Sequence, residues 1–214
     1  MQKNITDLRK EYSRSTLDFS NVLKDPLKQF EKWFDEAMQA GVTEPNAMHL
    51  ATVDEHGKPS SRIVLLKGIE ANRFIFYTNY QSKKGRELEQ NPACALTFFW
   101  PDIERQVRIE GVADRVDASL SDQYFQSRPR GSQIGAWASP QSTIIKDRDI
   151  LEERAQQMEK KFENDKVLPR PNQWGGYQID PLVIEFWQGR PSRLHDRIQF
   201  TKVDGEWRMN RLAP

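Results

Sequence analysis

Strand-like segments follow one another through most of this 214-residue sequence, with turns and short helical stretches between them. They cover residues 47–54, 61–69, 73–79, 93–100 and 105–116, and strand-like sequence returns at 182–189 and 193–202. Because few of the connections are long enough to hold a crossover helix, antiparallel pairing is favoured over a doubly wound parallel sheet. We therefore predict a mainly β protein with peripheral helices (α+β), built as an antiparallel barrel.

Four helices are expected around these strands. The first begins after Asp25, a residue type that caps helices, with Pro26 in the next position and Gly41 as the stop. Its apolar positions at helical spacing are Leu27, Phe30, Phe34 and Met38. The others are a short helix from the cap Ser82 to Asn91-Pro92, one at 118–127 and one at 149–162. The segment 131–144 has no usable period and is expected to be a structured loop.

Charge and composition exclude several classes of protein. Lysine and arginine total 32 residues against 31 acidic ones, whereas a nucleic-acid binder usually has a large basic excess. The single cysteine, Cys94, excludes an internal disulfide framework, and no apolar stretch is long enough to span a bilayer. The beginning of the sequence lacks the apolar core of a signal peptide. These features predict a cytoplasmic protein that binds neither nucleic acid nor membrane.

Familiar catalytic motifs are missing from the sequence. There is no GxGxxG, no GxxxxGK[ST] and no GxSxG, so a Rossmann site, a P-loop and a serine-hydrolase elbow are not expected. The three histidines, His49, His56 and His195, are too scattered for a recognisable metal motif. No metal site is predicted.

Two groups of basic residues have the chemistry to bind phosphate. Lys83 and Lys84 lie in the first turn of a predicted helix, where cations are unfavourable and anions are stabilised, just after Ser82. A solvated lysine pair would give the same sequence. Upstream, Arg62 and Lys67 bracket the apolar run IVLL, and strand alternation would place them on opposite faces. Because burying an unpaired charge is costly, each of these two cations should either meet an anion or reach solvent at its end of the strand.

The second group surrounds the expected end of the helix at 118–127. Arginine forks and hydroxyl groups suit a phosphate dianion, although a cationic helix end would look similar without any ligand. Its members are Tyr124, Arg128, Arg130 and Ser132.

The stretch IEFWQGRPSRLHDR at 184–197 is the richest in functional side chains. Arg193, His195 and Arg197 share a parity, so a regular strand would present all three on one face, with Trp187 nearby in sequence. Aligned cations repel one another unless something anionic or electron-rich lies against them. A functional role is favoured over a structural one here.

This stretch resembles in full the signature of the pyridoxamine 5′-phosphate oxidase family. The segment RIVLLK, the pair Tyr77-Thr78 and the ending WRMNRLAP resemble it too, and the similarity runs from about Arg9 to Pro214. It implies an FMN-binding split β-barrel and a homodimer with each flavin held at the subunit interface. Residues 1–24 have too few apolar residues for a core stripe and are expected to form a mobile N-terminal arm, which the resemblance implies is a lid, before an oxidase domain at 25–214.

The resemblance also implies roles for individual residues. The implied FMN contacts are Arg62, Ile63, Val64, Leu65, Leu66, Lys67, Tyr77, Thr78, Lys83, Lys84, Gln106, Gln141, Ser142, Trp187 and Arg197. The implied substrate contacts are Arg9, Lys10, Glu11, Tyr12, Lys67, Tyr124, Arg128, Ser132, Arg193, Leu194 and His195. Arg193 and His195 are the implied catalytic residues, with His195 the better candidate for proton handling.

The activity implied is oxidation of pyridoxine or pyridoxamine 5′-phosphate, small phosphorylated forms of vitamin B6, to pyridoxal 5′-phosphate. A hydride would pass from C4′ to flavin N5, and O2 would be reduced to hydrogen peroxide. Two alternatives stay open: a split-barrel flavin reductase and a non-catalytic carrier of pyridoxal phosphate. The family often has Arg-Lys at Lys83-Lys84, which affects the expected flavin affinity. The role of Glu44, where an aspartate is familiar, stays open.

Overall fold

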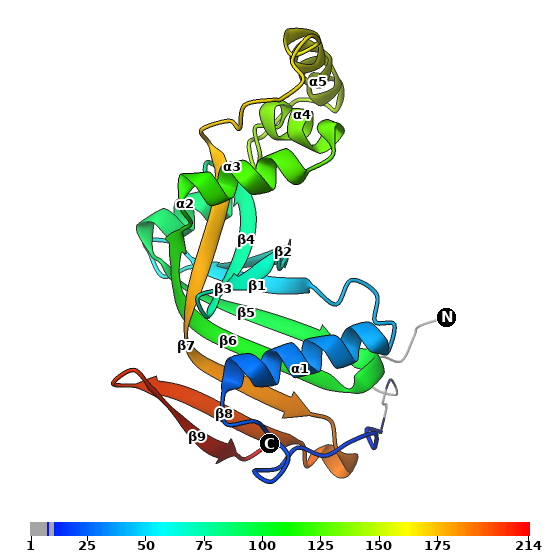
Figure 1. The fold of residues 1–214 in the computed structure, drawn as a ribbon, viewed down its shortest axis with the longest axis vertical. Coiled ribbons are helices and arrows are strands. Elements are labelled where there is room, and N and C mark those ends of the chain that lie inside the picture. The colour runs from blue at the N-terminus through cyan, green and yellow to red at the C-terminus, as the bar shows by residue number, and fades with distance from the viewer. Residues whose placement is uncertain (1–7, 9–10) are drawn as a thin grey trace. The chain divides into compact units, whose positions relative to one another are not determined.

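The computed structural model describes residue 8 and residues 11–214, and its strands form an antiparallel framework (Figure 1). Within these residues a nine-stranded sheet has the order β2-β1-β5-β6-β7-β4-β3, and β8 pairs with β7 and with β9. The strands are β1 Ala47–Val53, β2 Pro59–Leu65, β3 Gly68–Glu70, β4 Arg73–Asn79, β5 Ala93–Trp100, β6 Arg105–Arg115, β7 Trp174–Gln188, β8 Asp196–Val203 and β9 Glu206–Leu212. The prediction of a mainly β, antiparallel fold is confirmed.

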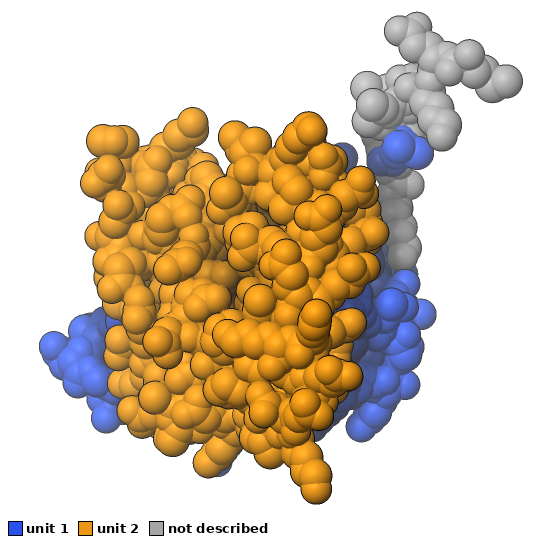
Figure 2. All heavy atoms as spheres, turned by 90° about the horizontal axis from the view of Figure 1, so that it is seen from above, with its two compact units in different colours: residues 1–49, 95–110, 181–214 blue, residues 50–94, 111–180 orange. Residues whose placement is uncertain are grey.

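The chain divides into two compact units, coloured separately in Figure 2. Unit 1 consists of residues 1–49, 95–110 and 181–214, and unit 2 consists of residues 50–94 and 111–180. The long strands β1, β5, β6 and β7 each contribute residues to both units. The division expected at residue 24 stays a prediction.

Helix α1, Pro26–Gln39, belongs to unit 1 and begins as its sequence predicts. The Asp25 carboxylate accepts a hydrogen bond from the Leu27 N–H at 2.8 Å, and the helix gives way to Gly41 in a left-handed conformation (φ 72°). The buried stripe differs from the expectation: Trp33 and Ala37 are buried, whereas Met38 is half exposed. A 3.6-residue period carries the stripe from Phe30 to Ala37.

Aromatic side chains form much of the core of unit 1. The Phe30 ring lies 5.0 Å from that of Phe98, and the Trp33 ring meets Phe186 edge-on at 5.2 Å. The segment before α1 adds to this core, because Leu17 and Val22 are buried. Apolar residues are sparse in this segment, but these two pack into the core.

Unit 2 carries the remaining helices, which are α2 Lys83–Gln90, α3 Ala118–Ser127, α4 Arg130–Ala138 and α5 Asp149–Lys161. The helices predicted at 118–127 and after Ser82 are confirmed, and Ser82 accepts a hydrogen bond from the Gly85 N–H. The expected loop at 131–144 is wrong over its first half, which is α4. This helix is short and contains Gly131 and Gly135, and of its buried residues Gln133, Ile134 and Ala138 only the last two are apolar.

Helices α3, α4 and α5 enclose a second hydrophobic core within unit 2. Phe125, Ile134, Phe162, Leu168 and Trp174 are its buried members. Figure 1 shows α4 and α5 beside each other, and α3 next to the first residues of β7. This core fixes the end of α3 and the start of α4, where the sequence has its second group of basic residues.

The segment expected as one strand at 61–69 is two strands. β2 ends at Leu65 and β3 begins at Gly68, and the Lys67 N–H donates to the Ile75 carbonyl at 2.8 Å. No helix in the described part of the chain combines the length and apolar character needed to cross a membrane.

Candidate active site

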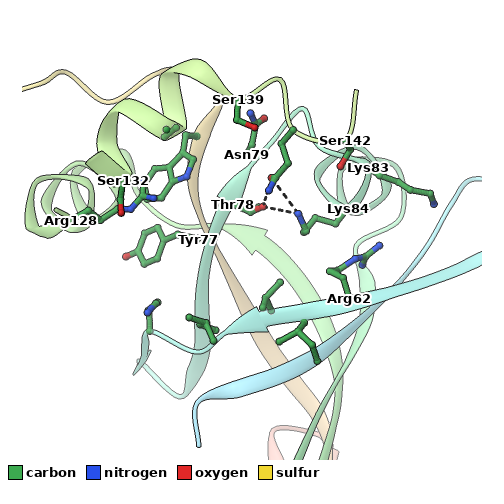
Figure 3. A pocket seen from close by; sticks show the side chains of 18 of the residues that line it. Arg62, Tyr77, Thr78, Asn79, Lys83, Lys84, Arg128, Ser132, Ser139 and Ser142 are labelled. Carbon is green, nitrogen blue, oxygen red and sulfur yellow. Dashed lines mark hydrogen bonds between the residues drawn. The ribbon is translucent and has the colours of Figure 1, made fainter. Parts of the chain in front are cut away.

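A cavity of about 980 Å³ opens in unit 2 and collects most of the predicted contacts (Figure 3). Its walls come from β2, β4, the start of α2 and the α3–α4 connection. Of the residues predicted from the sequence, it is lined by Arg62, Ile63, Val64, Leu65, Lys67, Tyr77, Thr78, Lys83, Lys84, Tyr124, Arg128, Ser132, Gln141 and Ser142. Leu66 is buried in the core and does not line the cavity.

Lys84 provides a buried positive charge in the wall of this cavity. Its ammonium group donates to Thr78 Oγ1 at 3.1 Å, to Ser82 Oγ at 3.3 Å and to Gln141 Oε1 at 3.4 Å, and these acceptors are all uncharged. Figure 3 shows its side chain directed toward Thr78. Burial and, after it, the nearby Arg62 lower the pKa of Lys84 to about 8, although Glu87 opposes the shift. An anion in the cavity would relieve this unfavourable state.

The two neighbouring cations, Arg62 and Lys83, are already paired with Glu87. Arg62 Nη2 lies 3.2 Å from Glu87 Oε2, and the Lys83 ammonium group also donates to this carboxylate. Thr52 Oγ1 and Ser60 Oγ donate to it at 2.6 and 2.8 Å. Burial would raise the pKa of Glu87, but these hydrogen bonds hold it at about 2. Sequence reasoning missed Glu87, because its i,i+4 spacing from Lys83 was the only local signal.

Arg128 provides a second, half-buried charge that lines the cavity. Its guanidinium carbon lies 4.6 Å from the centroid of the Trp174 ring, and burial lowers its pKa. Its Nη1 atom is buried without a hydrogen-bond partner in the described part of the chain. Unsatisfied buried donors are rare, so this atom points to a missing acceptor.

Arg130 does not join Arg128, although the sequence grouped the two. Its guanidinium donates to the carbonyl oxygens of Phe162 at 2.6 Å and Asp165 at 2.9 Å. Arg130 therefore ties α4 to the chain that follows α5. Arg128 precedes α4 and Arg130 is its first residue, so the two side chains reach different partners although they are two positions apart.

Stacked aromatic rings form part of the same wall. Tyr77 stacks on Tyr124 with ring centroids 3.9 Å apart, and on Trp174 at 5.6 Å. A side chain at Gly176, which is opposite Tyr77 in the β4–β7 register, would come within 2.8 Å of the Tyr77 ring. Burial, with a smaller contribution from Glu70, raises the pKa of Tyr77 to about 12. This phenol is protonated at neutral pH and offers a flat surface and a hydrogen-bond donor.

The other predicted residues belong to unit 1 and are Glu11, Tyr12, Gln106, Trp187, Arg193, Leu194, His195 and Arg197. Four of them form the unit 1 cluster: the Trp187 ring contacts the rings of Tyr12 and His195, and Trp187 pairs in register with Arg197. Arg9 and Lys10 lie outside the described residues. The site predicted from the sequence is therefore divided between the two units.

The parity argument for Arg193, His195 and Arg197 is wrong. Residues Pro191–Arg193 form a 3₁₀ turn, with Ser192 and Arg193 in left-handed conformations (φ 55° and 61°), and β8 begins only at Asp196. Pro191 cannot donate to a ladder, and the turn interrupts the alternation that a strand would impose. Of the three, only Arg197 lies in a strand, where it pairs in register with Trp187.

His195 is held at this turn as an acceptor. The Arg190 N–H donates to its Nδ1 at 3.1 Å, and its ring lies 4.6 Å from that of Trp187 and 5.9 Å from that of Tyr12. Burial and, next, the charge of Arg193 lower the pKa of His195, while Asp196 opposes the shift. The ring is therefore neutral at pH 7, and Nε2 carries its proton.

Arg197 is neutralised by a carboxylate that the sequence reasoning did not single out. Its Nε and Nη2 atoms donate to the two oxygens of Glu185 at 2.8 and 3.0 Å, and Nη1 donates to the Ala213 carbonyl. This bidentate pairing raises the pKa of Arg197. The alternation of Glu185 and Trp187 along β7 is visible in the sequence, but the pairing with β8 is not.

Hydrogen bonds to Glu104 and packing of Tyr12 against Gly189 hold the segment before α1 in place. Glu104 Oε2 accepts hydrogen bonds from the N–H groups of Ser13 and Arg14, each at 2.9 Å. A side chain at Gly189 would come within 2.7 Å of Tyr12 Cβ. These contacts keep Tyr12 beside Trp187 and His195 in this structure.

Comparison with known proteins shows the family of this chain. A family model described as pyridoxamine 5′-phosphate oxidase matches residues 34–162. A second, described as the pyridoxine 5′-phosphate oxidase C-terminal dimerisation region, matches residues 174–214. The chain belongs to the pyridoxamine 5′-phosphate oxidase family. The dimerisation region contains Trp187, His195 and Arg197 of the unit 1 cluster.

Full-length relatives carry the family name as well. A pyridoxine/pyridoxamine 5′-phosphate oxidase of Acaryochloris marina is 54% identical over 213 residues, which are 100% of this chain and 97% of the relative. One of Salinibacter ruber is 52% identical over 212 residues, 98% of this chain and 99% of the relative. The prediction that the chain is an enzyme of this family is confirmed.

Solved structures support the same fold. PhzG from Burkholderia lata, in complex with tetrahydrophenazine-1-carboxylic acid, has a TM-score of 0.87 at 29% identity and covers 94% of this chain and 100% of its own. A family-related FMN binding protein from Nostoc punctiforme has a TM-score of 0.68 at 18% identity and covers 86% and 97%. The split-barrel prediction is confirmed.

Proposed function

We propose that this protein is an FMN-dependent oxidase that converts pyridoxine 5′-phosphate and pyridoxamine 5′-phosphate to pyridoxal 5′-phosphate. The observation that carries the proposal is a pair of cations that line one cavity, the buried Lys84 and the half-buried Arg128. Neither forms a salt bridge within the described part of the chain. The reaction brings together two phosphate esters, the cofactor and the substrate, and each requires a cation of its own.

The cofactor end is assigned to Lys84 and its neighbours. Lys84, Lys83 and Arg62 supply positive charge, and Thr78, Gln141 and Ser142 supply neutral hydrogen-bonding groups. Ile63, Val64, Leu65, Lys67 and Tyr77 would contact the remainder of FMN. The cavity volume of about 980 Å³ is within the range of sites for molecules of this size and leaves room for a substrate.

The substrate end is assigned to Arg128 and the side chains around it. The unpartnered Nη1 of Arg128 would donate to the substrate phosphate, with Lys67, Tyr124 and Ser132 as further contacts. A guanidinium fork, an ammonium group and hydroxyl groups match the oxygens of a phosphate dianion.

We infer that the unit 1 cluster completes the site in a homodimer, with the flavin at the subunit interface. The match of residues 174–214 to a dimerisation region supports this arrangement. Gln106, Trp187 and Arg197 would be further flavin contacts. Arg9, Lys10, Glu11, Tyr12 and Leu194 would cover the substrate.

Arg193 and His195 are the proposed catalytic residues. Bound FMN would accept the hydride from C4′ of the substrate and pass the electrons to O2, giving hydrogen peroxide. Arg193, as a guanidinium with several N–H donors, would hold the 4′ oxygen or nitrogen of the substrate and stabilise charge there. The proton lost from that atom is assigned to His195, which would have to release the Arg190 N–H from Nδ1, the ring nitrogen that carries no proton, in order to accept it.

An anaerobic visible spectrum of the FMN-reconstituted protein tests the proposal. Pyridoxine 5′-phosphate should bleach the flavin band, and air should restore it with release of hydrogen peroxide. The variant Arg193→Leu should bleach far more slowly while its affinity for the substrate phosphate changes little. A band that persists with both vitamers but bleaches with a nicotinamide donor would instead support a flavin reductase. A protein that retains no FMN but binds pyridoxal phosphate would support a carrier.

A further inference from the structure

Glu87 is a buried carboxylate beside the proposed cofactor phosphate site, and it does not itself line the cavity. It is 3% exposed and accepts hydrogen bonds from Thr52, Ser60, Arg62 and Lys83. A buried charge is tolerated only where it is paired and hydrogen-bonded, and Glu87 is both. It is therefore ionised in the ligand-free protein.

The two cations that neutralise Glu87 are the ones that line the cavity. Arg62 and Lys83 share this single carboxylate, while the adjacent Lys84 has only uncharged acceptors. Three cations against one carboxylate leave a local charge of +2. A phosphate monoester carries about −1.5 to −2 at pH 7, so the charges are matched.

We propose that Glu87 determines how strongly this cavity prefers a phosphorylated flavin over its unphosphorylated form. The inference rests on the proposed function and adds a specificity-determining residue to it. A phosphate at this end of the cavity competes with Glu87 for Arg62 and Lys83 and is repelled by its negative charge. Glu87 thus stabilises the empty cavity and limits its affinity for the phosphate.

Arg62 has enough other partners to keep its position without the charge of Glu87. Its Nη1 donates to Thr52 Oγ1 at 2.6 Å and to the Leu50 carbonyl at 3.2 Å, and its Nη2 donates to Ser60 Oγ at 2.6 Å. Glutamine has nearly the shape of glutamate and can still accept hydrogen bonds through its amide oxygen. The substitution Glu87→Gln therefore removes one charge and leaves the geometry of the guanidinium in place.

The test measures the binding of FMN and of riboflavin, which carries the same ring system without a phosphate. Dissociation constants at pH 7 come from the quenching of flavin fluorescence on binding. Glu87→Gln should bind FMN about tenfold more tightly, the order expected for one unit charge in a partly buried site. Its affinity for riboflavin should stay within about twofold of the wild type, since riboflavin has no charge there to be repelled.

Glu89→Gln is the matched control. Glu89 lies on the same helix, and its substitution makes the same change in net charge, but its side chain is exposed and pairs with Arg115 at 2.8 Å. Both flavins should bind this variant as they bind the wild type. The double variant Glu87→Gln/Lys83→Gln restores the local charge of +2 and should return FMN affinity to the wild-type value. It also keeps the local charge of the wild type if Glu87→Gln alone folds poorly, because only Arg62 then lacks its carboxylate, and Arg62 retains Leu50, Thr52 and Ser60 as acceptors.

Three results would overturn the role of Glu87: FMN affinity that is unchanged or weaker in Glu87→Gln, equal changes for FMN and riboflavin, or a double variant that binds FMN much more weakly than the wild type. Inorganic phosphate provides a readout that does not depend on flavin. It should raise the unfolding temperature of flavin-free Glu87→Gln by more than that of the wild type. If the wild type binds neither flavin, the proposed function fails, and the phosphate shift still decides the role of Glu87.

Discussion

The guanidinium of Arg128 stacks on the ring of Trp174 at 4.6 Å, while its Nη1 atom is buried with no hydrogen-bond partner in the described residues. The ring compensates for part of the lost hydration of the cation, but it cannot accept a directed hydrogen bond as an oxygen does. In the ligand-free protein Arg128 is therefore held in place at a cost in stability. Oxygen atoms of a ligand would remove that cost.

Replacing Arg128 with methionine should separate binding from stability. Arg128→Met should raise KM for pyridoxine 5′-phosphate roughly 10- to 100-fold, the size of one or two charge-assisted hydrogen bonds. Its unfolding temperature without ligand should not fall, because a half-buried cation with an unpaired buried Nη1 atom has been removed. Arg130→Met is the control: it should lower the unfolding temperature and change KM little, since the Arg130 guanidinium donates to the carbonyls of Phe162 and Asp165. The opposite pattern would contradict the assignment.

The affinity for FMN should decrease as the pH rises through about 8, the pKa of Lys84 in the ligand-free protein. Above that pH the lysine is neutral and attracts a phosphate less. Stability should change in the other direction: between about 8 and the ordinary value of 10.5 the unfolded chain binds the proton that the folded chain has lost. Lys84 therefore makes the folded protein more stable as the pH rises through this window.

Fluorescence titrations with FMN at a series of pH values check this expectation, with Lys84→Met as the control. The control should bind FMN roughly 10- to 100-fold more weakly at pH 7. It should also lack the decrease above pH 8. A wild-type affinity that is flat over this range, or a control that retains the decrease, would show that another group is responsible.

The imidazole of His195 should titrate below 6.5 in the flavin-free protein, and its two charged neighbours should move the pKa in opposite directions. Arg193→Gln should raise the pKa of His195, because the Arg193 charge lowers it, and Asp196→Asn should lower it further. Proton NMR of the imidazole Cε1–H follows each titration. Equal shifts in the same direction would mean that the variants disturb the burial of the ring and leave the role of the charges unsupported.

Substitution of Gly189 should release the segment that carries Tyr12. A Cβ atom at Gly189 would lie 2.7 Å from Tyr12 Cβ and Cγ, so Gly189→Ala should detach Tyr12 and weaken the Glu104 contacts to Ser13 and Arg14. Trypsin should then cleave after Arg14 several-fold faster, as identified by mass spectrometry. Gly131→Ala, whose Cβ would meet nothing within 4 Å, should leave the cleavage rate unchanged. Equal rates in all three proteins would contradict the docking.

Local sequence signals predicted the helix ends and many of the strands. Asp25 and Ser82 cap their helices because a carboxylate or hydroxyl oxygen needs only the next few N–H groups. Helix α4 was not predicted, because a nine-residue helix with two glycines has too few apolar residues to show a helical period. The turn at 191–193 was not predicted either, because serine and arginine rarely adopt positive φ and nothing in the sequence marks Ser192 and Arg193 as doing so.

For the candidate site, the sequence pointed to the cations and missed their counter-ions. Charge, position and family resemblance point to Lys84 and Arg128, and both line the same cavity. The partners Glu87 and Glu185 were not singled out. Arg62 is 25 residues from Glu87, and Arg197 is 12 residues from Glu185. Such pairs depend on the tertiary arrangement of strands and helices, which local sequence does not reveal. Which cations remain unpaired is therefore a property of the fold.

The division of the chain into two units restricts how the cavity can be moved between proteins. The polypeptide passes from one unit to the other at residues 49–50, 94–95, 110–111 and 180–181, so neither unit is a continuous stretch of sequence. A single cut or a single gene fragment cannot deliver either unit by itself. Recombination with a relative would have to exchange both segments of unit 2 together to transplant the cavity intact.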